Sequence, residues 1–276
     1  MKPRLIKVGL CAVACAIMVH AGLANADDMV PEFAQDDPAR IWIDDDTLNF
    51  YGAISIASRD VFLNFIATED TSAVRRFMIN SLGGDTNTGR VIGRWINDQS
   101  LEVVIDAICF SSCANYIFPA GTSRAILADS FVGWHGSETQ YDIIALSMPG
   151  QSGDDLERQA LRTALVPALP EGASSDVIDR AVDQQVALAD ISQQDEADYF
   201  AAIGISGEFT LHGLRPGAID SWRESGRAGW TYTLDDMERF GLGPVRFLGD
   251  GAYALSRQVL RNVFVIPYDL EDLGAQ

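Results

Sequence analysis

Residues 101–121 read LEVVIDAICFSSCANYIFPAG, which places an apolar strand directly before a short helix. The strand is expected over Leu101–Ala107, and the helix begins at Cys113. Between them lie two serines bracketed by Cys109 and Cys113. A serine on a sharp strand-to-helix turn is exposed, and the N–H of the following residue lies at the positive end of the helix. The pattern predicts Ser112 as a candidate nucleophile, although a serine that only caps the helix would look the same.

Segments with strand and helix patterns alternate on both sides of this stretch. Strands are expected over 40–43, 48–56, 75–80, 124–128 and 131–135, and helices over 59–67 and 86–97. Strands that alternate with helices at this spacing favour right-handed crossover units and a parallel sheet covered by helices.

From about residue 150 the chain is mainly helical by spacing and rich in Asp, Gln and Ala. Long helices are expected over 152–166 and 174–203, and Gly204 is a natural C-terminal stop for the second. A helix over 234–241 and strands over 245–248 and 263–268 follow. We therefore predict one α/β domain over 27–276, with a core formed by 40–145 and 205–270 and a helical arm over 150–203.

The first 26 residues resemble an export signal. They open with Lys2, Arg4 and Lys7, continue with an apolar run and close on Ala24-Asn25-Ala26, a small-x-small cleavage pattern. No later run is apolar enough to span a bilayer. The sequence predicts a signal peptide over 1–26 and a periplasmic or secreted protein that does not insert into a membrane after signal removal.

The charge and the scarcity of lysine exclude several functions. The chain has a formal net charge of −19, and a surface this acidic argues against nucleic acid as a partner. Both lysines lie in the signal, which excludes Schiff-base, pyridoxal and Ser-Lys chemistry in the mature chain. We expect no cofactor and no metal, because two distant histidines, His135 and His212, and two cysteines make only a weak case for structural zinc.

A glycine turn and a histidine complete the candidate site. Residues 79–84 read INSLGG, between an expected strand and an expected helix, and glycines there can expose backbone N–H groups to an anion or oxyanion. His135 closes the apolar run that starts at Phe131. Each feature alone is common, because many such turns carry Gly-Gly and many strand-end histidines only pack in the core.

Taken together, these residues resemble the Clp protease proteolytic-subunit family within the broader crotonase-like fold. The family pattern of I-N-S-P-G-G, A-A-S-M-G, M-I-H-Q and a late E-A-x-x-Y-G-L helix end is matched in order and approximate spacing over about 40–250. The matching segments here are INSLGG at 79–84, SSCANYIFPAG at 111–121, FVGWHG at 131–136 and DDMERFGLGPV at 235–245. The chain looks more similar to a predicted periplasmic group with a Cys-x-Ser-x-Cys nucleophile segment than to the cytosolic protease. The resemblance implies a ClpP/crotonase-like fold.

The resemblance also implies roles for individual residues. Ser112 would be the nucleophile and His135 the general base, with the N–H groups of Gly84 and Cys113 as the oxyanion hole. The family's aspartate falls near Ser225, which has no carboxylate, so we assign the third triad position to the nearby Asp220. Glu224, or no carboxylate at all, remains an alternative.

Three functions fit this pattern. The first is a serine peptidase that hydrolyses peptides or flexible protein segments, since an exported chain would not meet the cytosolic unfoldase of the family. The second is a catalytically silent binding or scaffold protein on the same fold. The third is acyl-thioester chemistry, for which such an acidic chain is a poor host because coenzyme A is anionic. We expect a homo-oligomer, as is common for crotonase-like folds.

The two cysteines outside the signal are expected to form a disulfide. In a straight strand, four residues span about 13 Å, too far for a bridge whose Cα atoms must lie within about 4.4–6.8 Å. A sharp strand-to-helix turn brings Cys109 and Cys113 back into range, and export would let the bridge persist. The alternative is a pair of buried thiols that pack as small hydrophobic groups.

Overall fold

The computed structural model describes residues 37–273, and the expected signal peptide lies outside them. Its main sheet has the order β1-β2-β3-β4-β5-β8, with β6 also paired to β4. β1 and β2 pair antiparallel, and the other neighbours pair in parallel. The strands are β1 (Arg40–Asp44), β2 (Thr47–Tyr51), β3 (Arg76–Ser81), β4 (Glu102–Phe110), β5 (Ser123–Ile126), β6 (Phe131–Gly133) and β8 (Val245–Phe247). Within the described residues, no helix is long and apolar enough to cross a membrane.

Strand β4 pairs with β3 along one edge and with two strands, β5 and β6, along the other. Its first part pairs with β5, from Glu102 to Ile105, and its last part pairs with β6, from Ile108 to Phe110. Between them Ala107 has a positive φ of 65°, and its N–H donates to the Ser130 hydroxyl. The bulge lets β4 continue to Phe110, three residues beyond the predicted end, and carries the chain into the serine turn.

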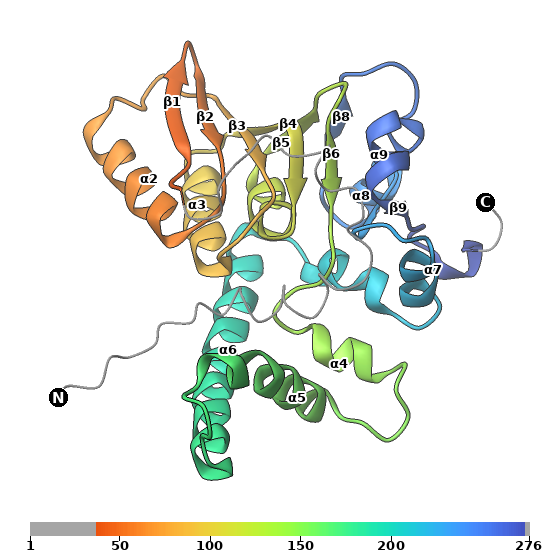
Figure 1. Cartoon of the computed structure of the whole chain (residues 1–276). Coiled ribbons are helices and arrows are strands. Elements are labelled where there is room, and N and C mark those ends of the chain that lie inside the picture. The colour runs from red at the N-terminus through yellow and green to blue at the C-terminus, as the bar shows by residue number, and fades with distance from the viewer. Residues whose placement is uncertain (1–36, 274–276) are drawn as a thin grey trace.

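Helices α2 (Ile56–Thr68) and α3 (Thr86–Asp98) cover one face of the sheet (Figure 1). Each begins at a side-chain cap, Ser55 for α2 and Asp85 for α3, as expected where helix N–H groups lack partners. Phe62 of α2 is fully buried and meets the Trp95 ring edge-on at 5.3 Å. Burial of such side chains, each worth about 1.5–3 kcal/mol, fixes this layer.

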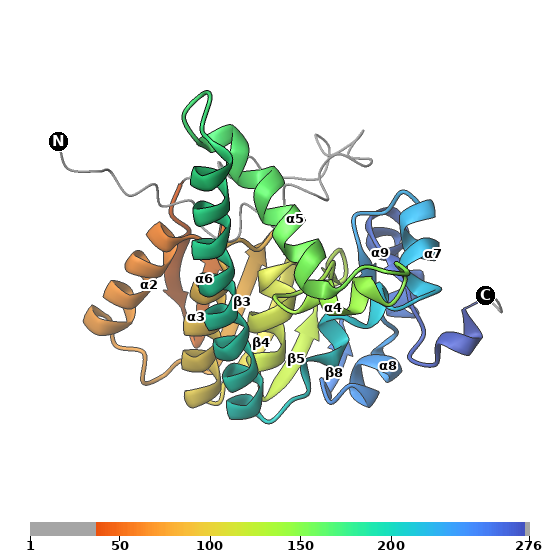
Figure 2. The ribbon, with the colours of Figure 1, turned by 90° about the horizontal axis from the view of Figure 1, so that it is seen from below.

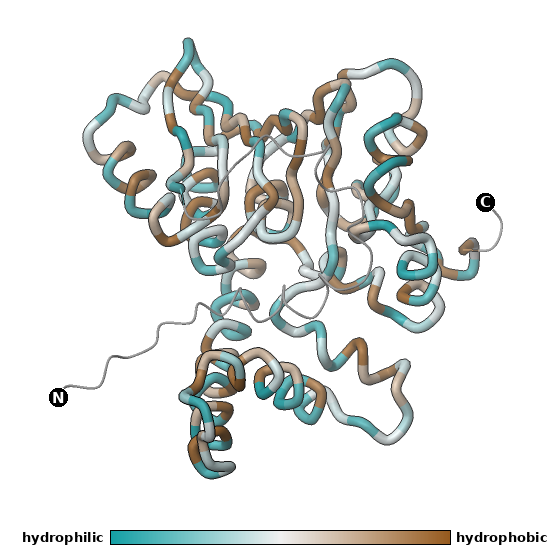
Figure 3. Tube along the Cα trace, viewed as in Figure 1, coloured by the Kyte–Doolittle hydropathy of each residue, from teal (hydrophilic) through white to brown (hydrophobic). Residues whose placement is uncertain are grey.

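The helical arm lies at the carboxyl ends of the parallel strands (Figures 1 and 2). It consists of α5 (Gly153–Leu165) and α6 (Ser175–Ile203), and the short helix α4 (Gln140–Ala145), which precedes the arm, packs against α5. Leu161 and Leu165 pack against Val182 in a small second core. Hydrophobic residues are frequent along the sheet strands, whereas the arm helices carry hydrophilic and hydrophobic residues side by side (Figure 3).

The C-terminal part lies next to β6 and β8, at the end of the sheet opposite β1 (Figure 1). It contains α7 (Ala218–Glu224), β7 (Trp230–Thr231), α8 (Leu234–Arg239), α9 (Arg257–Asn262) and β9 (Phe264–Val265). Trp134, just after β6, exchanges two backbone hydrogen bonds with Trp230 of β7. This bridge fixes the chain immediately before His135.

The predicted fold class, an α/β fold of strand–helix crossover units with a helical arm, is confirmed. α6 ends at Ile203, and Gly204 adopts the left-handed conformation expected of a helix stop. The strand predicted over 48–56 is too long: it ends at Tyr51 because Gly52 turns the chain with a φ of 143° and Ser55 then caps α2. The domain limits remain predictions.

Candidate active site

Ser111 lies at the turn where β4 ends. Its φ of 58° is in the left-handed region, which is rare for a residue with a side chain. Its N–H donates to Gly133 O at 3.1 Å, and its carbonyl accepts from the N–H of Asn115 at 2.8 Å. The chain therefore passes at Ser111 from the sheet into the π-helix Cys113–Ile117.

His135 contacts the hydroxyl of Ser111. The distance from its Nε2 to Ser111 Oγ is 2.7 Å, within hydrogen-bond reach. The contact arises because β6 pairs with the last part of β4, so the residues that follow the two strands meet at one end of the sheet. In a parallel sheet this end is where ligands commonly bind.

Ser112, the residue expected to be the nucleophile, is turned away from His135. It is 2% exposed, and its hydroxyl donates to the carbonyl oxygen of Gly84 at 2.6 Å. Because Ser111 already occupies the left-handed position of the turn, the next side chain faces the glycine turn instead. The geometry thus places Ser111, and not Ser112, beside the histidine.

The glycine turn packs directly against the two serines. Gly83 has a φ of 92°, and a Cβ on it would lie 2.7 Å from Ser111 Cβ and 2.8 Å from Ser112 N. Backbone bonds from Ile54 N to Gly83 O at 2.9 Å and from Asp85 N to Ile54 O at 2.6 Å hold the turn in place. Gly84, an expected oxyanion donor, is the next residue of this turn, and its carbonyl oxygen accepts the Ser112 hydroxyl.

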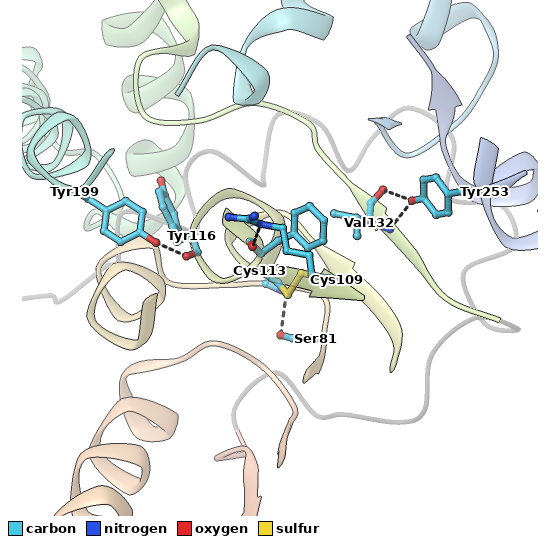
Figure 4. Close-up of a disulfide and its surroundings, with 10 residues drawn as sticks. Ser81, Cys109, Cys113, Tyr116, Val132, Tyr199 and Tyr253 are labelled. Atoms are coloured by element: carbon cyan, nitrogen blue, oxygen red, sulfur yellow. Dashed lines mark hydrogen bonds between the residues drawn. A yellow bond between two sulfur atoms is a disulfide. The ribbon is translucent and has the colours of Figure 1, made fainter. Parts of the chain in front are cut away.

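The second expected oxyanion donor, Cys113, is fully buried and one residue beyond Ser112. In a turn with Ser111 as nucleophile, the N–H of the next residue belongs to Ser112. Cys113 instead forms the predicted disulfide with Cys109, with a Cα–Cα distance of 5.1 Å (Figure 4). The disulfide joins the end of β4 to the start of the π-helix, and Ser111 is the middle residue of the five-residue segment that it closes.

The other ring nitrogen of His135 has no partner. Nδ1 is buried and forms no hydrogen bond within the described part of the chain. Asp220, the expected third triad member, is exposed on α7 and makes no hydrogen bond to His135. Burial lowers the pKa of His135 to about 4, because no neighbouring carboxylate stabilises the imidazolium.

Buried polar contacts hold the π-helix and the histidine segment together. Asn115 Nδ2 donates to Gly136 O at 2.9 Å, which joins the helix to the residue after His135. The Tyr116 hydroxyl donates to Glu196 of α6 at 2.7 Å, and Tyr199 donates to the Tyr116 carbonyl (Figure 4). Helix α6 of the arm therefore supports the π-helix that follows the two serines.

Comparisons with known proteins show a resemblance to solved structures. No model of a protein family matches the chain, and no curated protein matches it. Methylmalonyl CoA decarboxylase has 10% identity and a TM-score of 0.31 over 64% of this chain and 93% of that one. An enoyl-CoA hydratase from Mycobacterium avium subsp. paratuberculosis has 11% identity and a TM-score of 0.30 over 67% and 99%. A mutant of a membrane-bound stomatin-specific protease has 13% identity and a TM-score of 0.28 over 50% and 68%.

Sequence reasoning missed three residues of this site. Ser111 is the central residue of the Cys-x-Ser-x-Cys pattern at 109–113, and that spacing could have identified it. Asn115 follows four residues later, on the π-helix Cys113–Ile117. Glu196 gave no local signal, because it lies in a long acidic helix that looks solvent-exposed. Across the described residues, no group of three or more histidine, cysteine or acidic side chains could hold a metal ion.

Proposed function

We propose that this protein is a serine hydrolase that cleaves peptides or flexible protein segments, with Ser111 as nucleophile and His135 as general base. The observation that carries the proposal is the 2.7 Å contact between His135 Nε2 and Ser111 Oγ. A nucleophile and a base within about 2.6–3.2 Å of each other are the minimal unit of this chemistry. The left-handed φ of Ser111 further supports it, since nucleophilic serines often lie on such strained turns.

The proposed reaction uses this pair in two steps. Ser111 Oγ attacks the carbonyl carbon while its proton moves to His135 Nε2, and the carbonyl oxygen becomes an oxyanion. The N–H of Ser112 and, as the second proposed donor, the N–H of Gly84 would stabilise that charge, at about 2.7–4 kcal/mol per donor. The N–H of Gly83 is not a candidate, because it already donates to Ser81 Oγ at 3.1 Å. His135 then gives the proton to the leaving amine, and water hydrolyses the acyl-enzyme by the same path in reverse.

The pair would act as a dyad. Without a carboxylate at Nδ1, the imidazolium that forms during attack has no charge partner, so the rate should be below that of a full triad. The backbone bridge at Trp134 and the Asn115–Gly136 bond position the histidine segment instead. We also propose export to an oxidising compartment, which the Cys109–Cys113 disulfide supports.

A catalytically silent binding protein is the second candidate. It is favoured by the unpartnered Nδ1 and by the low pKa of His135, both of which weaken the base. One experiment separates the two functions: incubation of the chain from residue 27 onward with a peptidyl phosphonate, followed by mass spectrometry of the peptide that contains 107–121. We expect a covalent adduct on Ser111.

The matched variants Ser111→Ala and Ser112→Ala give the control. Ser111→Ala should lose the adduct. Ser112→Ala should keep it if the variant folds, because the Ser112 hydroxyl donates to the Gly84 carbonyl and does not contact His135. A wild-type protein that stays unmodified at all probe concentrations would support the silent binding protein instead.

A further inference from the structure

A cavity of about 130 Å³ lies between the segment that follows His135 and helix α6. Its walls come from the segment after His135, from the C-terminal half of α6 and from the turn that follows α6. The residues used below are Ser137, Thr139, Glu196, Ala197, Phe200 and Leu211. Ser137 is two residues beyond His135, so the two Cα atoms are at most about 7 Å apart. This short spacing makes the cavity a candidate subsite for the side chain of a substrate bound at Ser111.

Glu196 is a buried carboxylate in the wall of this cavity. The residue is 4% exposed, and its two oxygens accept from the Tyr116 hydroxyl at 2.7 Å and from the Ser137 hydroxyl at 3.3 Å. Buried charges in proteins are normally paired with an opposite charge. Among the described residues, no arginine lies within ion-pair distance of Glu196.

The nearby arginines are already engaged by other carboxylates. Arg90 pairs with Asp195 at 2.5 Å and with Glu138 at 3.4 Å, and Arg94 pairs with Asp195 at 2.6 Å. In this cluster two guanidinium groups face three carboxyl groups, counting Glu196. One negative charge is left without a cation.

The environment of Glu196 agrees with a missing cation. Burial raises the pKa of Glu196 to about 7. The hydrogen bond from Tyr116 opposes this rise, the charge of Glu138 adds to it, and the charge of Arg90 and the backbone of Glu138 oppose it to a smaller extent. The carboxyl is therefore only partly ionised near neutral pH. A cation in the cavity would favour the ionised form and recover the electrostatic energy that burial costs.

We propose that this cavity is a subsite for the alkyl-ammonium side chain of lysine, with Glu196 as its counter-ion. Phe200, Leu211 and Ala197 provide apolar walls for the methylene stem, and Ser137 and Thr139 add polar residues to the lining. An ammonium fits better than a guanidinium, because both Glu196 oxygens already accept a hydrogen bond and offer no free bidentate edge. The acidic chain, with a net charge of −19, would also attract basic peptides.

The cation site can be tested without any catalysis, although its role as a subsite rests on the proposed peptidase function. Binding of n-butylamine and of n-butanol to the Ser111→Ala variant is measured by calorimetry near pH 8, where Glu196 is mostly ionised. We expect the amine to bind at least about tenfold more tightly than the alcohol, since the alcohol leaves the carboxylate unpaired. Equal affinity for both ligands would overturn the proposal.

Two variants and one control assign the binding to Glu196. Glu196→Gln keeps the side-chain shape and a hydrogen-bonding oxygen, and should remove the preference for the amine. Glu208→Gln makes the same charge change on an exposed residue near the cavity and should leave the preference intact. If Glu196→Gln fails to fold, Ala197→Phe, at an exposed position of the cavity wall, should block both ligands, and unchanged amine binding in it would refute the site.

Probe selectivity then separates this proposal from the proposed function. Two peptidyl phosphonates that differ only in lysine or norleucine beside the phosphorus are compared on the wild-type chain. Faster labelling by the lysine probe, reduced to parity in Glu196→Gln, supports both proposals. Equal labelling by the two probes refutes the subsite and leaves the hydrolase intact. Absence of labelling refutes the hydrolase, and the amine-binding comparison then decides the cation site alone.

Discussion

His135 stacks on Phe110, the residue immediately before the serine that it contacts. The ring centroids lie 5.2 Å apart with an interplanar angle of 24°. Such stacking is worth about 0.5–1.5 kcal/mol beyond burial, and it fixes the imidazole plane while Nε2 faces Ser111. His135 is half-buried, and this burial lowers its pKa to about 4.

The low pKa predicts an unusual pH dependence. A general base must be neutral, so activity should be lost only when pH falls through the folded-state pKa of about 4. We expect kcat/KM for a small peptide ester to stay level from about pH 8 down to about pH 5 and then to fall. Folding stability should decline earlier, as pH falls below the ordinary histidine pKa of 6.5, because the unfolded chain takes up the proton first. An acid limb near the ordinary value would contradict a half-buried imidazole whose Nδ1 has no partner among the described residues.

Replacing each of the two described histidines distinguishes the base from a structural residue. His135→Ala should reduce kcat by about 10²–10⁴, the usual contribution of general-base catalysis. His212 is buried, bonds the Pro267 carbonyl at 3.0 Å and is surrounded by aromatic rings, so His212→Ala should lower the thermal midpoint while the remaining folded protein keeps its kcat. Turnover numbers per folded molecule check this, and equal losses in both variants would remove His135 from the reaction.

Asp220 offers a direct test of the dyad. It is exposed on α7 and makes no hydrogen bond to His135, so Asp220→Asn should leave turnover within a few-fold of the parent. Loss of a true triad aspartate costs about 10⁴ in kcat. A loss of that size in Asp220→Asn, measured on the same peptide ester, would mean that α7 moves to the histidine in the working enzyme.

The sequence predicted what depends on local pattern and failed where the backbone makes an unusual turn. Apolar runs predicted β3 and β4, and helical spacing predicted the long α6. The sharp strand-to-helix turn predicted the disulfide. The choice between Ser111 and Ser112 depends on which residue takes a positive φ, and hydrophobic periodicity carries no information about that. The bulge at Ala107 and the π-helix after the serines are equally invisible to a pattern of period 2 or 3.6.

Long-range placement limited the prediction of the candidate site in a second way. Glu196 lies 85 residues beyond Ser111 in the sequence, on a helix whose other acids are largely exposed. Its burial follows from the packing of Tyr199 and Phe200 against the π-helix residue Tyr116, a contact between segments with no shared motif. The cavity beside His135 therefore emerges only from the tertiary structure.

The glycine turn should tolerate no side chain at Gly83. A Cβ there would lie 2.5 Å from Phe110 O and 2.7 Å from Ser111 Cβ, so Gly83→Ala must push the serine turn out of place. Gly217→Ala is a matched control, because Gly217 has a similar φ of 86° but open space around its Cβ position. Both variants should lose about 1–2 kcal/mol from the left-handed backbone. Only Gly83→Ala should also abolish phosphonate labelling, and retained labelling in that variant would show that the turn does not position Ser111.

The disulfide should matter more for the site than for global stability. Alkylation of the denatured, unreduced chain from residue 27 onward should modify no cysteine, and reduction should add the mass of two hydrogens. In the chain-entropy model, a loop this short contributes only about 2 kcal/mol to the free energy of unfolding.

The double variant Cys109→Ala/Cys113→Ala should therefore stay folded by circular dichroism. It should lose most phosphonate labelling, because the bridge holds the two ends of the segment that carries Ser111 and the N–H of Ser112. The conservative control is Cys109→Ser/Cys113→Ser, which keeps the polarity and most of the volume but not the covalent bond. If both double variants label Ser111 at the wild-type rate, the hydrogen bonds of Ser111 to Gly133 and Asn115 are sufficient to form the turn, and the bridge has no catalytic role.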